Sequence, residues 1–351
     1  MRAKGIAALA TAAVGVGAGL VAQRSAIQRR RRTDPEAGEP FGKQRGHSPR
    51  TISLPDGARI FIEEAGPPSR KGAVFIHGSA MRNDTWHYQM EGLGGHRLVF
   101  YDLRGHGLSQ PKGDADFSIR TLAEDLGKVI EEADLDEVVI VGHSIGGMVA
   151  LEHCHLNPGL VGSKIRGVVL LNTTHRPAVE TLLGGASVAR IERFFRRPLD
   201  VMGSRAEYVE RLRKIIKPSD SIFMVVAAAA FGPHASAKQI DFTYDMLAET
   251  SADVLFDLMK SYRDFDVTEH LGEIKVPALV VGGTHDRLTV LAASEHLAAN
   301  LPKAELKVLT GCGHMSMLER HRDLNRLMTA FLDDALGPPD VSELDGDASS
   351  L

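Results

Sequence analysis

The chain has 351 residues, of which 43% are hydrophobic and 25% are charged, and its formal net charge at pH 7 is −4. This length and composition allow a globular protein with a substantial core. Seven of the 41 basic residues lie in residues 1–33, which contain no acidic residue, so the remaining chain has 34 basic and 45 acidic residues. Such an acidic body lacks the clustered cations that bind phosphates, which argues against nucleic acid as a partner.

The sequence contains no pattern typical of a metal or cofactor site. Its two cysteines, Cys154 and Cys312, allow at most one disulfide and form no Cys-x-x-Cys pair. Neither a dinucleotide Gly-x-Gly-x-x-Gly motif nor a phosphate-binding Gly-Lys-Ser/Thr motif is present. His153 and His155 flank Cys154, but successive residues of a helix point about 100° apart, so one ion cannot contact all three. We expect no metal and no cofactor.

The N-terminal residues resemble a membrane signal. Residues 6–22 are uncharged and rich in Ala and Gly, and the basic cluster 29–32 follows them. This stretch is close to the lower limit for spanning a bilayer, and the positive-inside rule keeps such a cluster in the cytoplasm. We therefore expect residues 1–33 to be a membrane anchor with the body inside. A cleaved signal peptide with export to the cell envelope and a frayed soluble end are the alternatives. Residues 34–49 are predicted to be a linker.

From residue 50, short apolar strands alternate with amphipathic helices. After a predicted hairpin over 51–64, Ser118 is a candidate N-cap for a helix whose apolar residues share one face. This alternation with apolar strands predicts an α/β fold with a mostly parallel central sheet and helices on both faces. Strands are expected at 73–76, 97–101, 138–141, 167–171, 278–282 and 305–309. The last two helices of the core are expected at 290–301 and 324–336.

Between residues 173 and 266 the alternation stops. The pattern there is mostly helical and predicts an inserted helical cap. The core is thus expected to comprise residues 50–172 and 267–336, and the acidic tail 337–351 to be disordered. The expected cap helices are 178–195, 205–216, 221–231 and 243–262.

The four-residue run Val138–Val141 leads directly into Gly142-His143-Ser144-Ile145-Gly146 and then into a helix-forming stretch. A strand that turns sharply into a helix brings backbones close, which explains glycine on both sides of Ser144. The turn would expose the Ser144 hydroxyl above the N-terminal end of the following helix. This pattern predicts a catalytic nucleophile; a glycine-rich turn whose serine merely caps the helix is the alternative.

A serine hydroxyl needs a base within hydrogen-bond reach, and that base must be oriented by a third group. Asp286 and His314 each follow a predicted strand in the C-terminal part, at the sheet edge where Ser144 is also expected. Ser144, Asp286 and His314 are therefore the candidate catalytic residues. His106 is another histidine that could be taken for the base, but the family resemblance described next implies a structural role for its loop.

From about residue 50 to residue 336 the chain resembles capped α/β-hydrolases of the serine carboxylesterase and lipase-like branch. The resemblance rests on four motifs in the order that this superfamily shows: His77-Gly78, the loop Asp102 to Ser109, Gly142 to Gly147, and the pair Asp286 and His314. It implies that Ser144 is the nucleophile, that His314 is the general base and then acid, and that Asp286 orients the imidazole. It also implies an oxyanion hole formed by the backbone N–H groups of Ser79 and Ile145.

These features predict hydrolysis of a hydrophobic small-molecule ester through an acyl-enzyme on Ser144. Phe223, Met224, Val226 and Phe231 in the cap are candidates for the substrate pocket, although packing within the cap explains each of them equally well. The alternatives are a carbon–carbon bond hydrolase, a cofactor-free haloperoxidase-like enzyme, and a non-catalytic binding module. The sequence does not determine the substrate or the oligomeric state.

Overall fold

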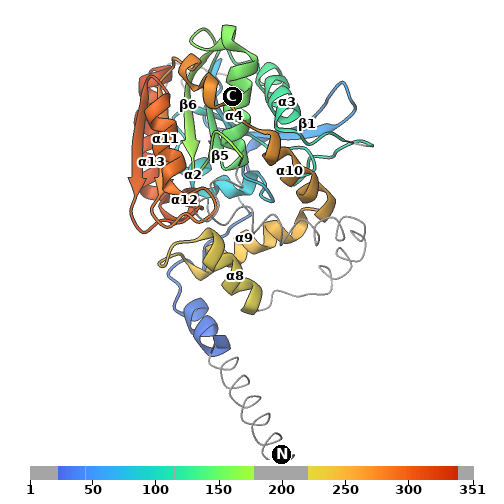
Figure 1. Ribbon diagram of the computed structural model, residues 1–351. Helices are drawn as coiled ribbons and strands as arrows, with labels where there is room; N and C mark the ends of the chain where they lie inside the picture. Colours follow the sequence, from blue (N-terminus) through green and yellow to red (C-terminus); the bar gives the residue numbers. More distant parts are fainter. Residues whose placement is uncertain (1–22, 44, 114, 178–219, 339–351) are drawn as a thin grey trace, which may run out of the picture.

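The computed structural model describes residues 23–43, 45–113, 115–177 and 220–338 (Figure 1). Its centre is an eight-stranded sheet with the strand order β1-β2-β4-β3-β5-β6-β7-β8. β2 is antiparallel to both β1 and β4, and all other neighbouring pairs are parallel, which confirms the predicted mostly parallel sheet. The strands are β1 (His47–Ser53), β2 (Arg59–Ala65), β3 (Lys71–Ile76), β4 (Arg97–Tyr101), β5 (Glu137–His143), β6 (Ile165–Leu171), β7 (Ala278–Gly283) and β8 (Ala304–Leu309).

Helices cover both faces of this sheet. In β5, Val138 and Ile140 belong to one buried cluster, whereas Val139 and Val141 belong to the other. Side chains alternate between the faces of a strand, so a strand covered on both sides is apolar throughout. The first cluster includes side chains of α3 (Ile119–Glu132), α4 (Ile145–Leu156) and α11 (Leu291–Asn300), and the second includes side chains of α2 (His87–Gly92) and α13 (His321–Leu336).

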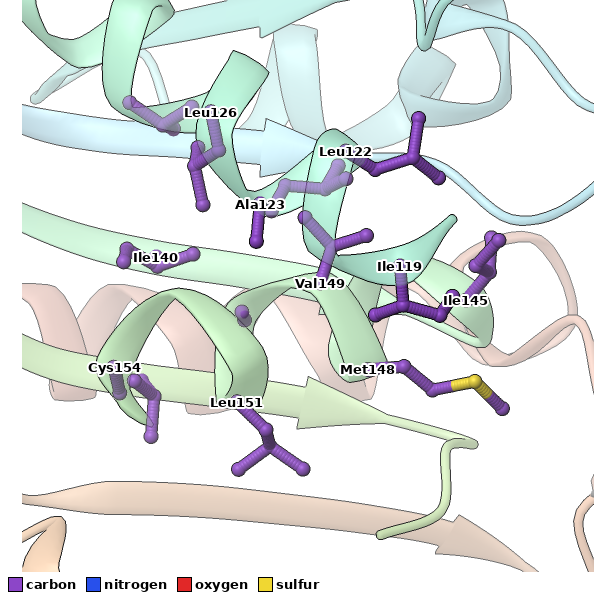
Figure 2. Close-up of a cluster of buried hydrophobic side chains, with 14 of the residues drawn as sticks. Ile119, Leu122, Ala123, Leu126, Ile140, Ile145, Met148, Val149, Leu151 and Cys154 are labelled. Carbon is purple, nitrogen blue, oxygen red and sulfur yellow. The ribbon is translucent and has the colours of Figure 1, made fainter. Parts of the chain in front are cut away.

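The helix that follows Ser144 packs into the first cluster. Figure 2 shows Ile145 and Met148 of α4 in the same group as Ile119 and Leu122 of α3, all of them buried. The predicted N-cap of α3 is present, since Ser118 Oγ accepts a hydrogen bond from the N–H of Thr121 at 3.1 Å. This packing fixes the start of α4, and with it the turn that carries Ser144.

The described part of the cap consists of α8 (Asp220–Ala230), α9 (Ala237–Glu249) and α10 (Ala252–Asp264). The expected helices 178–195 and 205–216 lie outside the described residues. The single helix expected over 243–262 is instead parts of two helices, because Thr250 is extended and Ser251 starts a new helix by accepting a hydrogen bond from the N–H of Val254. The shorter helical elements are η1 (Asn83–Trp86), η2 (Pro158–Leu160), η3 (Thr268–Glu273) and α12 (Ser316–Glu319).

Residues 23–43, called here the N-terminal arm, lie against the cap. Residues 23–32 form a helix next to α8 and α9, with Ile27 buried (Figure 1). Arg31 binds Asp241 of α9 through two hydrogen bonds of 2.9 and 2.8 Å, and its guanidinium lies 4.9 Å from the ring centroid of Phe223 in α8. The arm therefore joins the fold through specific contacts.

The segment expected to be a linker, 34–49, also takes part in the fold. Asp34 accepts hydrogen bonds from Ser236 and from the N–H of Lys238 at the start of α9. Phe41 stacks on Phe242 with 4.8 Å between ring centroids, and residues 47–49 already belong to β1. Residues 6–22 and most of the tail 337–351 lie outside the described residues. Within the described ranges, every helix is too short or too polar to cross a bilayer.

Candidate active site

Ser144 is the single residue between the end of β5 and the start of α4, as the strand–turn–helix pattern predicts. Its backbone has φ 54° and ψ −120°, a strained conformation for a residue other than glycine. A Cβ on Gly142 would lie 2.3 Å from the carbonyl oxygen of Gly146, and a Cβ on Gly146 would lie 2.2 Å from that of Ile76. Both glycines are thus required by close backbone approach.

Asp286 and His314 meet at the carboxyl edge of the sheet. Nδ1 of His314 lies 2.9 Å from Oδ2 of Asp286, and both side chains are buried. With Nδ1 donating its proton to this carboxylate, Nε2 is the basic nitrogen of the imidazole. His314 and Ser144 line the same cavity. The structure therefore brings all three predicted catalytic residues to one place.

The carboxylate of Asp286 is surrounded by hydrogen-bond donors. Oδ2 also accepts from the Asn172 amide at 2.8 Å and from the Thr289 hydroxyl at 2.8 Å. Oδ1 accepts from the backbone N–H groups of Leu288 and Thr289, each at 2.9 Å. Burial alone would raise the pKa of Asp286, but the adjacent His314 and these donors lower it to about 2. The carboxylate stays ionised and fixed in orientation.

The loop expected to form the oxyanion hole follows β3. Ser79 lines the cavity at Ser144, and Ile145 is buried at the first position of α4. The next residue, Ala80, donates its N–H to Nε2 of His106 at 3.2 Å, and burial lowers the pKa of His106 to about 4. A neutral imidazole can accept this bond. His106 thus anchors the loop, and the structure places it in a supporting position away from the triad.

The cavity beside Ser144 has a volume of about 390 Å³ and is mostly apolar. Four residues of α8 form one of its walls: Val225, Val226, Ala229 and Ala230. Helices α9 and α10 contribute Thr243, Leu247, Met259 and Tyr262, and the core contributes Met81, Met148, Leu288 and Met315. An apolar space of this size suits a small hydrophobic ligand.

Of the four cap residues predicted to line the pocket, Val226 lines the cavity, whereas Phe223, Met224 and Phe231 are not among its described lining residues. Met224 is 44% exposed, because it points away from the α8 face that contains Val226 and Ala229. Phe223 is buried beneath Arg31 of the N-terminal arm. Phe231 directly follows the last residue of α8, and its backbone lies against Gly313. A role of these residues in substrate binding stays a prediction.

Two groups of described residues bring three potential metal ligands together, with their ligand atoms within 4.8 Å of one another. Neither group contains a residue of the candidate active site, and His153 and Cys154 are in neither. The absence of a metal from the chemistry stays a prediction. The groups are His155, His270 and Glu273, and Glu39, His87 and Glu91.

Sequence reasoning missed several residues that support the triad. Asn172 and Thr289 bind Asp286 as described, and His143 donates from Nε2 to the backbone carbonyl of His314 at 3.0 Å. Burial lowers the pKa of His143, so the ring is neutral. Asn172 directly follows the buried strand β6, and this position at the carboxyl edge was a signal that could have identified it.

Comparison with known proteins supports the same family assignment. Residues 73–327 match the model of the alpha/beta hydrolase family. A non-heme chloroperoxidase from Streptomyces lividans is 30% identical over 288 residues, covering 80% of this chain and 99% of the relative. A 2-hydroxy-6-oxononadienedioate/2-hydroxy-6-oxononatrienedioate hydrolase from Cupriavidus pinatubonensis is 26% identical over 296 residues, covering 81% of this chain and 94% of the relative.

Solved structures share the fold. An esterase from Exiguobacterium antarcticum superimposes with a TM-score of 0.65 and 20% sequence identity, covering 82% of this chain and 100% of the esterase. The Ser144 turn, the Asp286–His314 pair, the sheet order and the match over residues 73–327 agree with one another. The chain belongs to the alpha/beta hydrolase family.

Proposed function

We propose that this protein is a serine esterase that cleaves carboxylic esters with a hydrophobic acyl group. The observation that carries the proposal is the placement of Ser144 and His314 in one apolar cavity, with His314 bonded to an ionised Asp286. Two further observations support it: the strained backbone of Ser144, and the similarity of the fold to that of the esterase from Exiguobacterium antarcticum. The substrate alcohol or acyl chain would occupy the space between α8, α9 and α10.

The reaction would follow covalent acyl transfer. Ser144 Oγ attacks the ester carbonyl while Nε2 of His314 removes the hydroxyl proton, and the backbone N–H groups of Ser79 and Ile145 stabilise the oxyanion. His314 then gives the proton to the departing alkoxide. A water molecule, activated by the same imidazole, hydrolyses the acyl-enzyme and restores Ser144. Asp286 keeps the imidazole in the required tautomer throughout.

A panel of p-nitrophenyl esters from acetate to dodecanoate tests this proposal, with Ser144→Ala as the matched control. We expect turnover of several esters by the wild-type protein and loss of at least 10³-fold in kcat for the variant. An equal rate in both proteins would contradict the proposal.

Two alternatives from the same family remain outcomes of this panel. A wild-type protein that turns over none of the esters but cleaves a vinylogous diketone would be a carbon–carbon bond hydrolase, as the relative from Cupriavidus pinatubonensis is named. Halide- and peroxide-dependent halogenation would instead match the chloroperoxidase relative. Inactivity in every assay would favour a binding module.

A further inference from the structure

Glu319, the last residue of α12, lies where the loop that carries His314 meets the cap. Its Oε1 accepts a hydrogen bond from the N–H of Gly313 at 3.0 Å, and its Oε2 accepts one from the N–H of Gly232 at 2.8 Å. Gly313 directly precedes His314, and Gly232 lies two residues beyond the end of α8. A single carboxylate therefore binds both the catalytic loop and the cap.

The two backbone segments that Glu319 joins are in direct contact. A Cβ on Gly313 would lie 2.5 Å from the carbonyl carbon of Phe231, and a Cβ on Gly232 would lie 2.1 Å from the carbonyl oxygen of Gly311. The N–H of His314 itself donates to the carbonyl oxygen of Ala230 at 2.8 Å. Ala230 lines the cavity at Ser144, so the base and the cavity wall share this contact.

We propose that Glu319 is a positioning residue that acts through His314, its ionised carboxylate holding the imidazole loop against the cap wall. It would keep the His314 ring between Asp286 and Ser144 and keep the end of α8 against the bound acyl group. This role rests on the proposed function, because it assigns Glu319 a part in catalysis by His314. It also explains why a carboxylate stands at a partly buried position where two backbone N–H groups bind it.

The contacts require the ionised form of Glu319. Two N–H donors need two accepting oxygens, and a protonated carboxyl replaces one of them with a hydroxyl that must itself donate. Burial raises the pKa of Glu319, the bonds from Gly232 and Gly313 oppose that rise, and the result is about 7. Protonation in the neutral range would thus weaken one of the two bonds, because a hydroxyl oxygen is a poorer acceptor than a carboxylate oxygen.

Several charged and titratable groups lie near Glu319. Sγ of Cys312 lies 3.9 Å from Oε1, the backbone N–H of Met315 helps to lower the pKa of Glu319, and the charge of Asp286 raises it. Glu319 also borders a second cavity of about 270 Å³. Its other charged and titratable residues are Arg30, Asp34 and Glu36 of the N-terminal arm, His234 of the cap and Arg320.

Ester hydrolysis by the Glu319→Gln variant tests this role across a pH range. Glutamine keeps the shape of the side chain but has one accepting oxygen, so it mimics the protonated state. We expect kcat to fall about tenfold with a smaller change in KM, since a misplaced base weakens the transition state more than the ground state. Glu305→Gln, on the exposed surface of β8, is the matched control and should behave as wild type.

The shape of the pH profile separates positioning from a structural role. Protonation of Glu319 should lower kcat of the wild type about tenfold with a midpoint near pH 7, and this step adds to the loss that protonation of His314 causes. In Glu319→Gln the step should be absent, so kcat of the two proteins should become equal on the acid side. A variant with lower kcat that still shows the wild-type step would overturn the proposal, as would a variant with unchanged kcat.

Amide resonances in ¹⁵N-glycine-labelled protein give a readout that does not depend on activity. The N–H signals of Gly232 and Gly313 should shift together with a midpoint near pH 7 in the wild type and should not titrate in Glu319→Gln. Signals that do not titrate in the wild type would overturn the role of Glu319 even if the esterase activity is found. Titrating signals in a protein without esterase activity would instead contradict the proposed function and leave the Glu319 contacts standing.

Discussion

The side-chain amide nitrogen of Asn172 lies 2.8 Å from Oδ2 of Asp286, the same carboxylate oxygen that faces Nδ1 of His314. Asn172 is fully buried and has φ 47°, a conformation that asparagine adopts more readily than most residues. Its amide also lies 3.2 Å from the carbonyl oxygen of Gly313. One side chain thus contacts both Asp286 and the loop that carries His314.

Replacing Asn172 with alanine should therefore lower activity without removing a catalytic group. The carboxylate of Asp286 would lose a charge-assisted donor, its pKa would rise, and its orientation toward His314 would loosen. We expect kcat/KM on the best ester to fall about tenfold. The exposed Asn300→Ala variant is the control, and equal kinetics of the two variants would show that Asn172 does not position Asp286.

The ionised Asp286 should make stability depend on pH in the acid range. Its folded-state pKa of about 2 lies below the ordinary value of 3.8, so the native state favours the charged form. This contribution is complete above about pH 5 and is lost as the pH falls toward 2. We expect the difference in free energy of unfolding between wild type and Asp286→Asn to shrink by about 2 kcal/mol over this range.

Urea denaturation at a series of pH values measures that difference. A wild-type advantage that stays constant from pH 5 down to the lowest pH at which both proteins fold would contradict the assigned charge state.

The α8 wall of the cavity should set the preferred acyl length. Ala229→Leu adds three carbons to the lining of the cavity, so longer acyl groups should lose more kcat/KM than acetate does. Ala228→Leu is the matched control on the same helix, since Ala228 is exposed and is not among the lining residues. An identical chain-length profile in both variants would exclude this wall from the acyl site.

The N-terminal arm should contribute to the stability of the folded protein through Arg31. This side chain is 26% exposed, forms two bonds with Asp241, binds Asp220 at 3.3 Å and covers the Phe223 ring. We expect Arg31→Ala to lower the free energy of unfolding by about 1–2 kcal/mol. Arg29→Ala, at an exposed position of the same helix, should cost much less. Chemical denaturation measures the free energy of unfolding of both variants. Equal losses in the two would show that the contacts of Arg31 contribute no net stability.

The parts of the site that the sequence predicted follow from local rules. Gly142 and Gly146 mark the turn at Ser144 because both must lack a Cβ, and Ser118 marks the start of α3 because its hydroxyl can cap a helix. Asp286 and His314 could be paired because the carboxyl ends of neighbouring parallel strands lie at one edge.

The parts that were missed depend on contacts between distant segments. Residues 34–43 have a linker-like composition, and their partners, among them Phe242, His87 and the start of α9, are distant in sequence. Phe223 is not among the cavity-lining residues, because the N-terminal arm packs on its face of α8. No local pattern shows which face of an apolar cap helix points to the nucleophile, since α8 is apolar on most of its surface.

Labelling with a fluorophosphonate probe tests the central assignment, the activated nucleophile at Ser144, most directly. The probe reacts with a serine whose hydroxyl a neighbouring base activates, and intact-protein and peptide mass spectrometry locate the adduct. We predict one adduct per chain on Ser144 in the wild type and none in Ser144→Ala. An unlabelled wild-type protein, or equal labelling of both proteins, would contradict the assignment.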